Sequence, residues 1–221
     1  MSIPSSAVTA QRWRSRRSAA VGGIVFAVLL ITVLVLMRVA VVDETLQDLV
    51  AHPRRQALMR TALQLVPFAG IAFLWFIGVV RDQLGDTEDR LFSSVFLGSG
   101  LLFLAMMFLG AVLATSLLRM VPGPDLGPGT WEFGRQSTVT LVTVYAMRMA
   151  AVFTATVSTV VLRTAAVHRN LAYVGYSAAL VLLLAGGRYR WVELLFPAWV
   201  LVLSVAILMT PERPRADTRP G

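Results

Sequence analysis

The segment STVTLVTVYAMRMAAVFTATVSTVVL, residues 137–162, is a nearly continuous apolar run with one charged residue, Arg148, near its middle. A helix of about 20 mostly apolar residues is long enough to cross the hydrocarbon core of a bilayer. A charged side chain at that depth needs a counter-charge, polar neighbours or a route to water. The segment therefore predicts a membrane-spanning helix and makes Arg148 the first candidate for a polar site.

The whole chain has the composition of an integral membrane protein. Of its 221 residues, 57% are hydrophobic and 14% are charged, whereas soluble domains carry about 25% charged residues. Apolar runs predict an all-α bundle of six transmembrane helices, at about residues 18–42, 57–80, 91–118, 137–162, 170–187 and 191–210. Residues 1–17 form a basic N-terminal tail in this scheme, residues 18–210 the transmembrane domain, and residues 211–221 a disordered tail.

Residue types that are absent or badly placed exclude several kinds of chemistry. The chain has no cysteine and no lysine, so thiolate catalysis, Cys-ligated metal and a lysine Schiff base are excluded. The two histidines, His52 and His168, fall in predicted loops, where they are no use as haem ligands within a bundle. Asp86, Glu88 and Asp89 suit the start of a helix better than a metal site. We therefore predict no catalytic residue, no metal and no cofactor.

The arginines predict topology rather than a nucleic-acid partner. The net charge is +8, but the arginines flank the apolar runs, and no basic domain stands apart from them. The first apolar run is longer than that of a typical signal peptide, so we expect it to be retained as a helix. More arginines fall in the predicted inner segments than in the outer loops, which predicts that both termini are cytoplasmic.

A helical wheel predicts the direction in which Arg148 points. The small residues on its side of the helix are Ala151, Ala155 and Thr159, and the bulky residues on the opposite side are Met149, Phe153, Val157 and Val160. Small residues suit helix contact and bulky ones suit lipid, so we expect Arg148 to face the bundle. Glu193, the only acid inside a predicted span, is its expected partner, and Tyr145 and Gln64 could complete a hydrogen-bonded network.

Three interpretations of Arg148 remain open at this point. It could tie helices together, it could snorkel to the interface if the true span begins near Met149, or it could form an anion or proton site with Glu193. The first interpretation fits a non-enzymatic scaffold or accessory subunit, and the last fits a small transporter or channel. The scaffold is favoured, as a homo- or hetero-oligomer formed through small-residue faces of the third and fourth helices. In a transporter, Arg148 should line a cavity reachable from water, and in a scaffold it should be sealed against Glu193 or peptide carbonyls.

Two stretches carry a family resemblance. They are FLWFIGVVRDQLGDTEDRLFSSVFLGSGLLFLAMMF at 73–108 and YAMRMAAVFTATVSTVVLRT at 145–164. Both resemble segments of uncharacterised multi-pass membrane proteins of actinobacteria. The resemblance implies a bacterial plasma membrane location and no catalytic residue.

Overall fold

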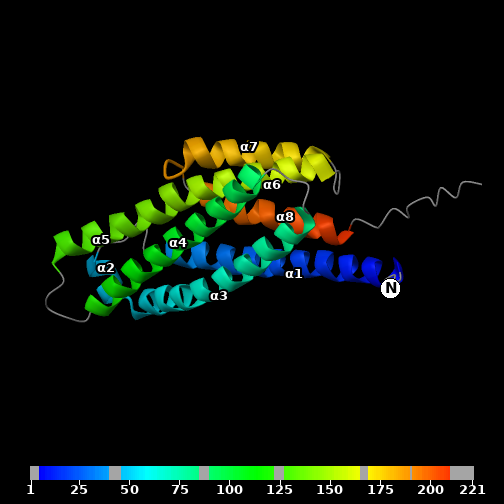
Figure 1. Cartoon of the computed structure of the whole chain (residues 1–221). Coiled ribbons are helices and arrows are strands. Elements are labelled where there is room, and N and C mark those ends of the chain that lie inside the picture. Colours follow the sequence, from blue (N-terminus) through cyan, green and yellow to red (C-terminus); the bar gives the residue numbers. More distant parts are fainter. Residues whose placement is uncertain are drawn as a thin grey trace, which may run out of the picture.

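The computed structural model describes residues 5–39, 46–84, 90–121, 127–164, 169–189 and 191–209. No strand occurs in these ranges, which confirms the all-α class. The elements are α1 (Ser5–Met37), α2 (Leu46–Ala51), α3 (Pro53–Leu84), α4 (Arg90–Met120), α5 (Pro128–Thr140), the π-helix η2 (Leu141–Ala146), α6 (Met147–Thr164), α7 (Arg169–Ala185), the 3-10 helix η3 (Val192–Leu194) and α8 (Leu195–Met209) (Figure 1).

Five described helices are long and apolar enough to cross a membrane. They are Ala20–Met37, Pro53–Arg81, Phe92–Met120, Pro128–Arg163 and Val192–Met209, and α7 is a shorter apolar helix. These six segments correspond to the six predicted spans. The protein is therefore an integral membrane protein whose helices meet the lipid bilayer.

The interval between the third and fourth predicted spans, residues 119–136, is largely helical in the structure. The helix α4 continues to Met120, and α5 already begins at Pro128. Proline is tolerated in the first turn of a helix, where its missing N–H would have no partner. Gly134 also serves packing, because a Cβ there would lie 2.6 Å from a methyl group of Leu117. Pro128 thus begins α5, and Gly134 allows α5 to approach α4 closely.

Three other predicted boundaries need comment. The second span begins at Pro53 rather than near residue 57, and the short helix α2 precedes it. The helix α1 begins at Ser5, so most of the predicted N-terminal tail is part of the first helix. The predicted disordered tail, residues 211–221, lies outside the described residues.

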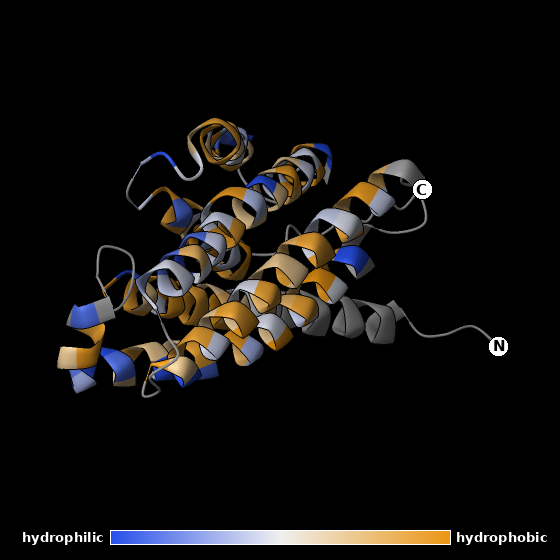
Figure 2. Cartoon of the chain, turned by 90° about the vertical axis from the view of Figure 1, so that its left-hand side faces the viewer, coloured by the Kyte–Doolittle hydropathy of each residue, from blue (hydrophilic) through white to orange (hydrophobic). Residues whose placement is uncertain are grey.

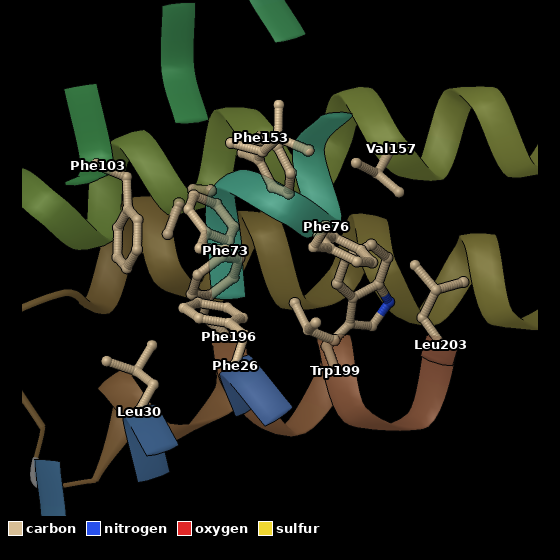
Figure 3. Packing of buried hydrophobic residues seen from close by; sticks show 14 of the residues in the cluster. Phe26, Leu30, Phe73, Phe76, Phe103, Phe153, Val157, Phe196, Trp199 and Leu203 are labelled. Atoms are coloured by element: carbon tan, nitrogen blue, oxygen red, sulfur yellow. The ribbon is translucent and has the colours of Figure 1, made fainter. Parts of the chain in front are cut away.

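Aromatic side chains fill the centre of the bundle. Seven buried phenylalanines from five helices meet there: Phe26, Phe73, Phe76, Phe96, Phe103, Phe153 and Phe196. The ring centroid of Phe73 lies 4.4 Å from that of Phe26 and 5.2 Å from that of Phe153 (Figure 3). Such ring pairs contribute about 0.5–1.5 kcal/mol each beyond the effect of area. We call this group the phenylalanine cluster.

The π-helix η2 and α6 form the most enclosed membrane span. An apolar 18-residue stretch within Pro128–Arg163 has 61% of its residues buried, the largest share among the corresponding stretches of the five long spans. The helix α6 packs against α4, α7 and α8. At the contact with α7, a Cβ on Gly175 would collide with the hydroxyl of Ser158 and lie 2.8 Å from Trp199 Nε1. Small residues of α6 are therefore used for contacts within the chain.

The exposed face of α3 changes character along its length. Its exposed residues are polar at Arg60 and Gln64 but apolar at Phe68 and Leu74. The helix α1 runs antiparallel beside it, and Met37, at the end of α1, lines the same cavity as Leu63. The change thus occurs at the level where α1 ends, which we call the Arg38 end of the bundle. Hydrophilic residues gather near helix ends and connections in Figure 2.

A small helical segment extends past this level. It comprises all of α2, residues 53–62 at the start of α3, residues 111–121 at the end of α4, and all of α5. We call it the projecting segment (Figure 1). Ten helical residues correspond to ~15 Å. Its own buried cluster consists of Leu49, Met59, Ala114, Leu117, Leu118, Val121 and Trp131. The projecting segment is thus held together by a second core, separate from the phenylalanine cluster.

Candidate functional site

A buried ion pair lies at the Arg38 end of the bundle. Arg38 follows the last residue of α1, and Glu193 lies in η3, just before α8. The guanidinium of Arg38 donates a hydrogen bond to the carboxylate of Glu193, and the two side chains are 10% and 7% exposed. Arg38 also lies over the ring of Trp191, with its Cζ 5.4 Å from the ring centroid. Charge pairing and a cation–π contact therefore hold the same guanidinium.

The turn after α7 brings Glu193 to this position. The helix α7 ends at Ala185, whose carbonyl accepts a hydrogen bond of 3.0 Å from the Arg188 N–H. Gly187 adopts a left-handed conformation at φ +78°, which costs glycine little. Trp191 is also left-handed, at φ 72°, which is costly for a bulky residue, by about 1–3 kcal/mol. The fold retains this cost at the residue that stacks on Arg38.

The ion pair lines a partly open cavity of about 70 Å³. That volume is enough for several waters or a small molecule, because one water needs about 10–15 Å³ on the same measure. Apart from the ion pair and two threonines, the lining is apolar: Val33, Leu34, Met37, Arg38, Leu63, Val66, Met107, Gly110, Ala111, Thr138, Val139, Val142, Thr143 and Glu193. The cavity thus combines a charged pair with apolar walls.

The π-helix forms one wall of the cavity. Val142 and Thr143 belong to η2, and Thr138 precedes it in α5. A π-helical turn inserts an extra residue into a helix and is frequent at functional sites. Across the cavity, a Cβ on Gly110 would lie 2.9 Å from Val142 Cγ2. Glycine at this position therefore lets α4 approach the π-helical wall closely.

A second, smaller void lies on the inner side of the cavity. Its volume is about 10 Å³, and it shares Val33, Val66 and Met107 with the larger cavity. Phe26 and Phe103 border it as well, and both belong to the phenylalanine cluster. The small void therefore lies between the cavity at the ion pair and the aromatic centre of the bundle.

The predicted polar core is wrong in its arrangement. Glu193 is buried as expected, but its partner is Arg38. Arg148 is exposed on the surface of α6 and forms no ion pair with any residue that the structure describes. Tyr145 is 53% exposed, and Gln64 is exposed on α3. The structure thus brings together neither Arg148 and Glu193 nor the proposed hydrogen-bonded network.

The assumption behind the helical wheel explains this error. Phe153, Val157 and Val160 were expected to face lipid, yet all three are buried, with Phe153 0% exposed. Because α6 lies between other helices, it buries bulky residues as well as small ones. Only a narrow stripe that includes Tyr145 and Arg148 remains on the surface. The exposed position of Arg148 agrees with the snorkelling interpretation.

Sequence reasoning missed Arg38, although a signal was present. Arg38 falls near the end of the first predicted span, and Glu193 falls at the start of the sixth. The predicted topology put both of these positions at the same end of the bundle. An ion pair between them was therefore possible on charge and depth. What the sequence does not show is that the first and sixth helices lie side by side.

The described residues show no candidate metal centre. No group of three or more His, Cys, Asp or Glu side chains among them could hold a metal ion. A comparison of the chain with known protein families, curated proteins and solved structures found no match. The assignment of Arg38, Glu193 and the cavity as the candidate site therefore rests on their geometry.

Proposed function

We propose that the protein is a small, non-enzymatic transporter of an organic anion in a bacterial plasma membrane, with both termini in the cytoplasm. One observation carries the proposal: a buried Arg–Glu pair lines a partly open cavity in an otherwise apolar bundle. Burying a charged pair is costly, and a cavity beside such a pair can hold a ligand. The combination of charge and apolar walls favours an anion that has an apolar portion.

The two charged side chains have complementary roles in this proposal. Arg38 keeps its positive charge in any protein environment and presents planar donors that match a carboxylate or phosphate. The Glu193 carboxylate accepts a hydrogen bond from that guanidinium when no substrate is bound. When Glu193 takes up a proton, it releases Arg38, which then binds the anion. One proton and one anion thus enter together, and the net charge of the site does not change.

The phenylalanine cluster is the internal gate in this proposal. Phe26 and Phe103 border the small void below the cavity, and Phe73 contacts both rings. A bound anion must pass these rings to reach the other side of the membrane. Alternating access therefore requires α1 or α8 to move relative to α3 and α4.

Flux measurements in proteoliposomes test the proposal. The protein is reconstituted, an inward gradient of an amphipathic sulfonate such as benzenesulfonate is applied, and internal pH is followed. We expect acidification with the wild type and a loss of at least about tenfold with Arg38→Gln or Glu193→Gln, since each removes a charged hydrogen bond. Arg119→Gln, at an exposed arginine on α4, is the matched control. Normal flux in both site variants would refute the role of the pair.

A scaffold or accessory subunit is the second candidate, because the projecting segment exposes Phe133. This side chain is 76% exposed on α5, close to the polar residues Glu132, Arg135 and Gln136, which bond to one another. An exposed aromatic side chain among polar neighbours suits contact with another protein. Purification in mild detergent of the wild type and Phe133→Ser tests this candidate. A partner lost from the variant, together with absent flux in the wild type, would favour it over transport.

A further inference from the structure

Arg148 and Arg188 are exposed arginines next to two segments that contact each other, η2 and the turn after α7. Gly187 packs against η2, since a Cβ there would lie 2.6 Å from Val144 Cγ2. Arg188 follows Gly187 directly, and Arg148 lies one turn after Val144. Both arginines are exposed, and neither forms an ion pair within the part of the chain that the structure describes. Two exposed arginines without an ion-pair partner among the described residues therefore lie on adjoining segments.

Two tyrosines indicate the depth of this region in the bilayer. Tyr145 and Tyr189 are both exposed, and tyrosine is enriched where membrane helices meet the headgroups. Arg163, exposed in the last turn of α6, is about 18 residues from Tyr145, or ~27 Å along the helix. This length is close to the ~30 Å hydrocarbon core of a bilayer. Tyr145 thus lies at one headgroup level, and Arg148 lies one turn deeper, within the reach of a snorkelling side chain.

We propose that Arg148 and Arg188 bind the phosphate group of an anionic phospholipid at the α6–α7 surface. A guanidinium binds phosphate through two parallel hydrogen bonds, and two guanidiniums match a lipid that carries net negative charge. The hydroxyl groups of Tyr145 and Tyr189 are at a suitable level to donate to the same headgroup. A zwitterionic lipid binds less well, because its cationic group repels the second arginine. The site is independent of the transport proposal.

The bilayer itself favours this occupant over another protein chain. The depth of the tyrosines places both guanidiniums at the level where lipid phosphates are abundant. The arginines are also exposed rather than set in a groove shaped for a helix.

Native mass spectrometry of the detergent-solubilised full chain tests the site. The wild type is incubated with phosphatidylglycerol or with phosphatidylcholine, and retained lipid is counted as the collision energy rises. We expect preferential retention of phosphatidylglycerol and a loss of about tenfold for each of Arg148→Gln and Arg188→Gln. Arg148→Lys should retain part of the binding. Arg119→Gln, which removes an exposed arginine from α4, should bind like the wild type.

Three results would overturn the proposal. The first is equal retention of the two lipids, and the second is an unchanged preference in the double variant Arg148→Gln/Arg188→Gln. The third is a dimer that dissociates in the Arg148→Gln variant, which would assign this surface to a second copy of the chain. Inorganic phosphate is added in a separate arm. If it displaces phosphatidylglycerol at millimolar concentration, the site binds free phosphate rather than a lipid headgroup.

Discussion

Removing one charge of the Arg38–Glu193 pair should destabilise the protein far more than removing both charges. Each side chain is about nine-tenths buried, so either charge left alone is poorly solvated. Breaking a buried pair at one partner costs about 3–5 kcal/mol, whereas replacing both partners by apolar residues is often close to neutral. We therefore expect Glu193→Leu and Arg38→Met each to lower the free energy of unfolding by about 3 kcal/mol. The double variant should lose only about 1 kcal/mol, mostly the stack on Trp191.

The measurement is a double-mutant cycle in bicelles with SDS as denaturant. Helix content is followed by circular dichroism, and the free energy of unfolding is compared across the four proteins. The expected coupling energy is about 5 kcal/mol, since the second substitution should relieve most of what the first costs. Arg119→Met, at an exposed arginine of α4, controls for the general loss of an arginine and should change stability by less than about 0.5 kcal/mol.

Additive effects in this cycle would refute the reasoning. If the double variant loses as much as the two single variants together, the charges do not interact in the folded protein. Single effects below about 1 kcal/mol would mean that both groups are well hydrated, as in a surface ion pair. Either result would also remove the basis for the transport proposal, because that proposal needs Glu193 to hold Arg38 when no substrate is bound.

Three further predictions concern packing and depth. Gly175→Ala should reduce the free energy of unfolding by about 1–3 kcal/mol, because the added Cβ meets α6 and Trp199. Gly78→Ala is the control and should be neutral, because nothing lies within 4 Å of its added Cβ. Thermal unfolding compares the two variants. Phe73→Ala should cost about 2–3 kcal/mol in the same assay, less than in a soluble core, because lipid already solvates apolar groups in the unfolded chain. In the natural cysteine-free background, Gln64→Cys should react with a membrane-impermeant maleimide and Leu74→Cys should not. Equal labelling would contradict the boundary drawn on α3.

The helices were predictable from sequence because span length and hydropathy are local properties. An apolar run near 20 residues specifies a membrane helix whatever its neighbours are. The continuation of helix from Pro128 was not predictable from composition alone. Whether Gly134 breaks a helix or lets it pack depends on whether Leu117 lies opposite, and that contact is tertiary.

The prediction that Arg148 faces the bundle was wrong for a different physical reason. A helical wheel assigns faces by assuming that a helix has one lipid side and one protein side. The helix α6 has neighbours on most sides, so Phe153 joins the phenylalanine cluster, and small residues contact α7 from another face. Only the number and position of neighbouring helices can decide which stripe remains exposed, and a single sequence does not contain that information.

The pairing of Arg38 with Glu193 depends on how the first and last membrane helices meet. In lipid, an arginine at a helix end has two options, namely the headgroup region or an acid at the same depth on a neighbouring helix. The helix α1 packs between α3 and α8, which brings the acid of η3 beside Arg38. Arg148 forms no ion pair among the described residues, and it remains exposed on the surface of α6. The same residue type therefore lines a cavity in one place and is exposed on the surface in the other, because helix packing decides whether an acid lies within reach.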